Sequence, residues 1–141
     1  MKKFLLVKLF VFSFFIGFSQ SPIGIWKNID DEDGKAKSHI EIYEKDGKLE
    51  GKVLKLLDNA TLKVCKKCKD ERKNAPIEGM VIMWDLKKSK NGYKDGKIID
   101  PKKGKEYGCK ISLASEDVLD VRGYLKFAAF GRTQQWYRVK E

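Results

Sequence analysis

A pair of cysteines separated by two lysines, Cys65–Cys68, is the sharpest chemical motif in this sequence. Thiols at this spacing form a disulfide, a redox pair or half of a metal site. A redox pair needs a low-pKa cysteine at a helix N-terminus, and no helix is predicted here, although the two lysines would lower a thiolate pKa. Zinc needs about four ligands, and Cys109 and His39 lie far away in sequence. In an exported chain we expect a structural Cys65–Cys68 disulfide, with redox, free-thiol and metal roles as alternatives.

The remaining nucleophilic residues give weaker signals. Cys109 alternates with apolar neighbours, which favours a small buried thiol over a disulfide to Cys65 or Cys68. His39 is the only histidine, and its parity places it opposite Ile40. No serine has a nucleophile elbow around it, so we expect no Ser-His-Asp triad.

An acidic cluster, Asp30-Asp31-Glu32-Asp33, precedes Gly34. Oxygen-rich loops can hold calcium, but the twelve-position calcium-loop pattern is absent and two lysines, Lys35 and Lys37, follow closely. We therefore expect a solvated hairpin turn, with calcium binding as the alternative.

Polar and aromatic side chains gather on the last two predicted strands and offer a candidate ligand-binding set. With one tryptophan from an earlier strand, the set comprises Trp84, Arg122, Tyr124, Arg132, Gln134 and Trp136. Arg122 and Tyr124 share a face opposite Val121, so an apolar interior would turn these two outward. A structural role, in which these side chains tie strands together and close one end, is favoured over ligand contact.

The first twenty residues have the organisation of an export signal. Two lysines follow the initiating residue, residues 4–18 are almost wholly apolar apart from Lys8, and Gly17 and Ser19 are small residues at a cleavage spacing. The uninterrupted apolar part is shorter than the roughly twenty residues that a spanning helix needs. We expect cleavage after Ser19 or Gln20 and a mature chain without a stable membrane anchor, in the periplasm or outside the cell.

The predicted mature chain, residues 21–141, has the length of a single domain. Loss of three lysines with the signal leaves 27 basic residues against 20 acidic ones, a net charge of +7. The lysines are scattered among turn residues and acidic neighbours, whereas a nucleic-acid binder concentrates basic residues among exposed aromatics. We therefore expect a basic surface and no nucleic-acid site.

Alternation with period two recurs along the mature chain, and no window sustains a helical period. Strands are predicted at 24–27, 38–44, 49–57, 80–87, 97–99, 107–113, 119–125 and 134–139. Asp46-Gly47 predicts a two-residue hairpin turn, since both residues tolerate positive φ. Asp95-Gly96 is also expected to form a break between strands. Residues 58–79 are predicted to form a long polar loop. Trp84 is expected on one face with Ile82 and Leu86.

About eight short antiparallel strands predict an all-β fold. An open sheet of that size would leave two exposed edges, and closure into a barrel removes both. We therefore predict an up-and-down barrel, with a two-sheet sandwich as the alternative. Eight strands enclose an interior that is filled by side chains or holds one small ligand.

Six segments, distributed in order over nearly the whole mature chain, carry a family resemblance. They are Gly24–Trp26, Asp30–Lys35, Glu41–Val53, Asp100–Tyr107, Val121–Tyr124 and Gly131–Trp136. In these segments the chain resembles domain of unknown function 2147, an uncharacterised family of exported bacterial proteins. The resemblance implies a lipocalin-like, or calycin-like, β-barrel and no established activity. Gly24-x-Trp26 with the late Arg138 is similar to the calycin arrangement, in which a last-strand arginine stacks on a first-strand tryptophan.

Three functions are compatible with these features. The first is a non-enzymatic binding module for a small, partly apolar or anionic ligand or an envelope partner, with no cofactor. The alternatives are an enzyme, either thiol-redox through Cys65 and Cys68 or an unrecognised hydrolase, and a solidly packed structural or stress-related envelope protein. The volume of the barrel interior separates the first from the last.

Export makes a direct prediction. Because residues 1–20 combine a basic start, an apolar middle and small residues at the exit, mass spectrometry of the protein from its host should find an N-terminus at Gln20 or Ser21. An intact first residue in a cytosolic fraction would contradict export.

Overall fold

The computed structural model describes Val11, Ser13 and residues 20–140. The predicted export signal lies outside the described residues, apart from Val11, Ser13 and Gln20, and stays a prediction. Eight strands follow one another along the described chain, with a single short 3₁₀ turn, η1 (Asp70–Arg72). The strands are β1 (Gly24–Ile29), β2 (Ala36–Lys45), β3 (Lys48–Leu56), β4 (Val81–Ser89), β5 (Gly92–Asp100), β6 (Lys105–Ser115), β7 (Val118–Tyr124) and β8 (Gly131–Arg138). Among the described residues, no helix is long and apolar enough to cross a membrane.

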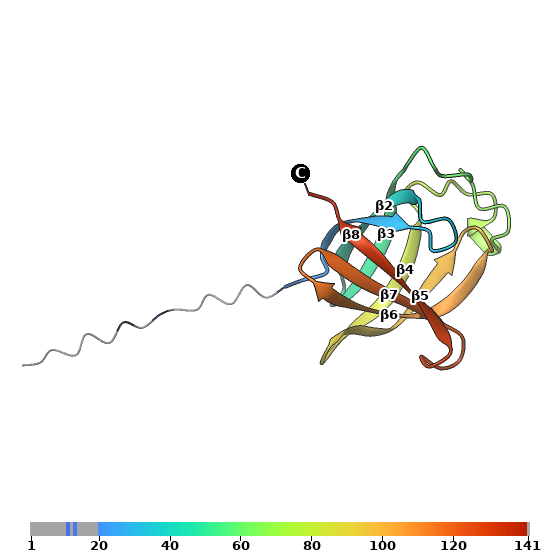
Figure 1. The fold of residues 1–141 in the computed structure, drawn as a ribbon. Coiled ribbons are helices and arrows are strands. Elements are labelled where there is room, and N and C mark those ends of the chain that lie inside the picture. The colour runs from blue at the N-terminus through green and yellow to red at the C-terminus, as the bar shows by residue number, and fades with distance from the viewer. Residues whose placement is uncertain (1–10, 12, 14–19, 141) are drawn as a thin grey trace, which may run out of the picture.

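Each strand pairs antiparallel with its neighbours in the sequence, and β1 also pairs with β8 (Figure 1). The result is a closed barrel in the order β1 to β8. Closure through the Trp26–Arg138 and Lys27–Tyr137 pairs leaves no free sheet edge. The predicted eight-stranded up-and-down barrel is confirmed, and the sandwich alternative is wrong.

Turn chemistry fixes the first hairpin. Asp46 and Gly47 adopt φ of 52° and 78° between β2 and β3, the left-handed values that a two-residue hairpin turn requires. The predicted turn at these residues is therefore confirmed.

Two β-bulges change the inward face of β4 and β5 relative to the sequence prediction. Asp95 has φ of 58° inside β5, so Asp95-Gly96 bends one continuous strand and does not end it. Asp85 has φ of 59° in β4, where the register with β3 shifts. Leu86 reaches across to β5, because a Cβ on Gly96 would lie 2.6 Å from its side chain. The close packing of Leu86 against β5 therefore requires a glycine at position 96.

Because of this irregular register, the residues of β4 that face the barrel interior differ from those predicted from the sequence. Ile82, Met83 and Leu86 are all buried, although the first two are consecutive in sequence. Trp84 lies outside the barrel interior, where the Arg72 guanidinium carbon stands 4.7 Å from its ring centroid. The expectation that Trp84 shares a face with Ile82 and Leu86 is therefore wrong, since two register shifts break the simple alternation.

One end of the barrel is plugged by Trp26, which is fully buried. Its indole N–H donates to the Pro22 carbonyl at 2.8 Å, and the Arg138 guanidinium carbon lies 4.3 Å from its ring centroid. Arg138 also donates to three backbone carbonyls at the same end, those of Ser21, Ile23 and Glu116. Gly24 leaves the room for this arginine, because a Cβ there would lie 2.9 Å from a guanidinium nitrogen.

Truncating Trp26 to Ala should destabilise the barrel by about 3–5 kcal/mol, the usual loss for a large buried aromatic. The matched control is Tyr137→Ala, since Tyr137 is 43% exposed and lies beside Arg138. Urea unfolding of both variants measures the difference. A loss below about 1 kcal/mol for Trp26→Ala would contradict the plug.

Candidate functional site

The opposite end of the barrel opens into a cavity of about 820 Å³. Ligand pockets commonly fall in the range of about 300–1,000 Å³. The turns that surround the opening are β1–β2, β3–β4, β5–β6 and β7–β8, whereas Trp26 and Arg138 lie at the far end. The barrel is therefore a cup with one sealed end and one open end.

Aliphatic side chains and one indole line the interior of the cup. Six strands contribute one buried apolar residue each: Ile40, Val53, Ile82, Ile99, Val121 and Trp136. Among the described residues, every buried side-chain nitrogen or oxygen has a hydrogen-bond partner. An apolar molecule can therefore fill the interior without leaving one of these polar groups unpaired.

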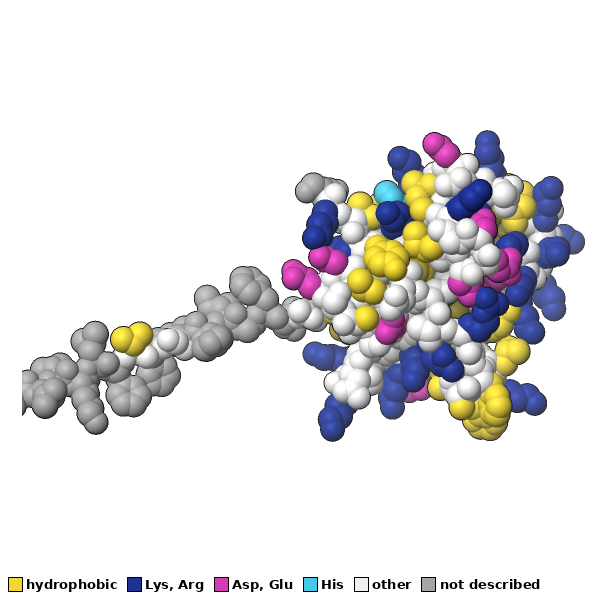
Figure 2. Space-filling view, viewed as in Figure 1, with side chains coloured by type: hydrophobic (Ala, Val, Ile, Leu, Met, Phe, Trp, Pro, Cys, Tyr) yellow, Lys and Arg dark blue, Asp and Glu magenta, His cyan; other side chains and the backbone are white. Residues whose placement is uncertain are grey.

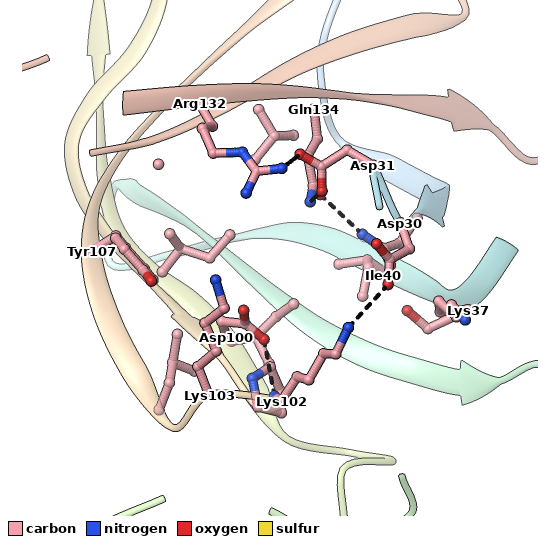
Figure 3. A pocket seen from close by; sticks show the side chains of 18 of the residues that line it. Asp30, Asp31, Lys37, Ile40, Asp100, Lys102, Lys103, Tyr107, Arg132 and Gln134 are labelled. Atoms are coloured by element: carbon pink, nitrogen blue, oxygen red, sulfur yellow. Dashed lines mark hydrogen bonds and ion pairs between the residues drawn. The ribbon is translucent and has the colours of Figure 1, made fainter. Parts of the chain in front are cut away.

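The acidic loop, residues Asp30–Asp33, lies at the cavity mouth. It is the predicted hairpin turn, in which the Gly34 N–H donates to the Asp30 carbonyl at 2.8 Å. Its carboxylates face cations from distant segments (Figure 3), which the sequence prediction missed. In the described chain, no three His, Cys, Asp or Glu side chains converge as a metal site would require.

Three cations hold the acidic loop in place. Asp31 pairs with Arg132 of β8 and also accepts a hydrogen bond from Gln134 at 3.1 Å. Lys102 of the β5–β6 turn lies 2.7 Å from Glu32, and Lys37 lies 2.7 Å from Asp33. Hydrogen bonds from these lysines lower the pKa of Glu32 and of Asp33. Such exposed pairs contribute little to stability, so their main effect is to orient the loop.

Gln134 links the mouth to the floor of the cavity. Its amide oxygen accepts from the Trp136 indole N–H at 3.2 Å, while its amide nitrogen donates to Asp31. Asn28 donates to the same amide oxygen at 3.4 Å. The indole is thereby fixed at the boundary between the apolar interior and the polar rim.

Lys103 and Tyr107 make the β5–β6 side of the mouth different from the side that carries the acidic loop. Both extend from the β5–β6 hairpin on the side facing Asp30 and Asp31 (Figure 3). In the described part of the chain, Lys103 forms no ion pair and the Tyr107 hydroxyl makes no protein hydrogen bond. One side of the mouth is therefore neutralised by ion pairs, and the other offers a cation and a phenol, with the Asp100 carboxylate nearby.

The structure brings four of the six candidate ligand-binding residues to the cavity. Tyr124, Arg132, Gln134 and Trp136 line it, whereas Trp84 and Arg122 do not. Tyr124 touches the cavity only at its rim: its ring covers Gly108, which alternates with the buried Cys109, so the ring lies on the outer face, as its parity predicted. Sequence reasoning missed Lys103 and Tyr107, and only their position after the strand-ending Asp100-Pro101 hinted that they lie at a barrel rim.

Arg122 points away from the cavity, as its parity predicted. Its Nε donates to the Ala128 carbonyl at 2.7 Å, and its other nitrogens donate to the Ala129 carbonyl and to the Thr133 hydroxyl. Its contacts are therefore those of the structural role, fixing the loop between β7 and β8.

The Cys65–Cys68 disulfide is confirmed, and both half-cystines are buried. Cys65 sulfur lies 3.3 Å from the Pro101 carbonyl oxygen, and Gly104 packs directly against the Lys67 backbone. The disulfide therefore fixes the β3–β4 loop against the β5–β6 turn, which places loop residues such as Leu62 in the cavity wall.

The other candidate nucleophiles do not form a reactive group. Cys109 is fully buried and free, and burial raises the pKa of its thiol to about 12. A thiol with this pKa carries almost no thiolate at neutral pH. His39 pairs with Lys27 and Lys55 on adjacent strands, and burial together with these cations lowers its pKa. The thiol-redox alternative thus gains no support from the geometry.

A closed eight-stranded barrel with one plugged end and one open cavity defines a lipocalin-like protein. Residues 24–138 match the family model described as "Uncharacterized protein conserved in bacteria (DUF2147)", and the chain belongs to this family. The resemblance seen in the sequence is thereby confirmed.

A solved structure supports the same class. The structure titled "Protein HP1028 from the human pathogen Helicobacter pylori belongs to the lipocalin family" is similar at a TM-score of 0.74 and 26% identity. The match covers 84% of this chain and 83% of that one. None of the curated proteins matches this chain in sequence.

Proposed function

We propose that this protein is exported and binds, without catalysis, a small molecule that has an apolar body and an anionic head group. The observation that carries the proposal is the cavity of about 820 Å³, which is apolar within and has Lys103 and the Tyr107 hydroxyl at its mouth. Barrels of eight strands hold either packed side chains or a single small ligand. A solidly packed structural barrel would leave no such volume.

The orientation of the ligand follows from the charges at the mouth. Ile40, Val53 and Val121 favour the apolar body inside, because burial of apolar surface drives association. Lys103 and the Tyr107 hydroxyl favour an anionic head at the opening, where water remains accessible. The cations opposite them are already paired with the acidic loop, so the head group is directed to the side of Lys103.

The test uses cis-parinaric acid, a fluorescent long-chain carboxylic acid, titrated into the protein in solution. Val121→Trp places an indole in the cavity and should weaken binding at least about tenfold. Lys103→Gln should weaken binding about twofold to fivefold, as expected for an exposed ion pair. The same variant should leave displacement by the alcohol of equal chain length unchanged, since an alcohol carries no charge.

Two controls accompany this titration. Lys110→Gln removes an exposed cation from the middle of β6, away from the cavity lining, and should bind as the wild type does. Ile82→Phe fills the cavity from another strand and guards against misfolding of Val121→Trp, with thermal unfolding recorded for both. Unchanged affinity in both cavity-filling variants would contradict the proposed function.

A further inference from the structure

The tip of the β7–β8 hairpin, residues 125–130, exposes three large apolar side chains. Leu125 is 45% exposed, Phe127 65% and Phe130 72%. The two phenyl rings lie 6.5 Å apart, and a compact apolar patch projects from the lower right of the molecule in Figure 2. Scattered exposed apolar residues are ordinary, but a projecting cluster of this kind marks an interaction site.

This apolar tip is held outward by the backbone. The Phe130 N–H donates to the Phe127 carbonyl at 3.0 Å, and the Leu125 N–H donates to the Phe130 carbonyl at 3.3 Å. Arg122 fixes the carbonyls of Ala128 and Ala129 from behind. The rings are therefore presented by a preorganised turn and lose little conformational freedom on binding.

The charges around the tip specify its partner. Residues 121–133 contain three cations and no acidic residue; Arg132 is paired with Asp31 and Arg122 with loop carbonyls, which leaves Lys126 as the cation at the tip itself. Exposed aromatics flanked by lysine and arginine match a lipid surface, where rings enter the acyl boundary and cations meet anionic head groups. A second copy of the chain fits less well, because it would bring the two Lys126 side chains together.

The tip is continuous with the cavity. Leu125 and Phe130 line the cavity mouth as well as being exposed, and Arg132 lies beside them at the start of β8. Contact of the tip with a lipid surface therefore brings the mouth toward the same surface. An apolar ligand that enters the cup from there avoids passage through water.

We propose that the β7–β8 tip docks on membranes that contain anionic phospholipids and that the cavity takes its ligand from the lipid layer. The second half of this inference rests on the proposed function, since it requires a ligand in the cavity. The docking itself depends only on the tip.

Vesicle flotation tests the docking. All eight strands lie between Gly24 and Arg138, so the barrel is complete in the predicted mature chain, which begins at Ser21. This protein should bind vesicles of phosphatidylglycerol and phosphatidylcholine, and bind pure phosphatidylcholine vesicles more weakly. High salt should weaken the first interaction, because it screens surface charges.

Variants at Phe127 distinguish insertion of the aromatic ring into the lipid layer from non-specific adsorption of the protein. Phe127→Asp should lower vesicle binding at least about tenfold, and Phe127→Trp should retain it, since tryptophan also favours the membrane interface. Leu54→Asp is the matched control, because Leu54 is 42% exposed on β3, away from the tip, and this variant should bind vesicles normally.

The outcomes distinguish this inference from the proposed function. Phe127 does not line the cavity, so Phe127→Asp should keep its affinity for cis-parinaric acid in solution while taking the probe from vesicles more slowly. Probe binding without vesicle binding would overturn the docking and leave the proposed function intact. A dimer in sedimentation velocity that Phe127→Asp abolishes, with vesicle binding unchanged, would assign the tip to self-association and overturn the proposal.

Discussion

The stacking of Arg138 on Trp26 is the interaction on which the rest of this structure depends. It joins the last strand to the first at the point where the barrel must close, and it covers the indole that seals one end. Without closure, β1 and β8 would be free edges open to pairing with other chains. Without the plug, that end of the packed barrel interior would be open to water. Gly24 contributes by leaving space for the guanidinium group.

Because one end of the barrel is sealed, the cavity opens only at the other end. Six strands supply the apolar lining of the cavity, and the turns and strand ends at the open end supply the charge, so polarity changes sharply at the mouth. The buried disulfide belongs to this construction, because it fixes a long loop against the β5–β6 turn and thereby completes the cavity wall. Its role is structural, since a buried disulfide offers no accessible sulfur for exchange.

Local alternation and turn residues were sufficient to predict the fold class from the sequence. The Asp46-Gly47 turn and the inward positions of Ile40 and Val121 follow directly from period-two patterning. The strand containing Trp84 was predicted, but its inward face was predicted wrongly, because its pairing with the neighbouring strand β3 shifts register twice. No local pattern reports such a contact between neighbouring strands.

The site was less predictable than the fold for a related reason. Asp31 and Arg132 are 101 residues apart in sequence, and only closure of the barrel brings them together. Lys103 is one of many lysines in the sequence, and its position at the mouth follows from the pairing of β5 with β6. Residue types suggested a set of candidates, whereas the three-dimensional arrangement shows which of them line the cavity.

The proposed function requires that the barrel interior be a ligand chamber whose ligand is oriented by the charges at the mouth. A crystal structure with a long-chain carboxylic acid brominated at its far end tests this most directly. An anomalous bromine peak is expected among Ile40, Val53 and Val121, with the carboxylate beside Lys103 and Tyr107. A bromine peak outside the barrel, or side chains filling the interior, would contradict it.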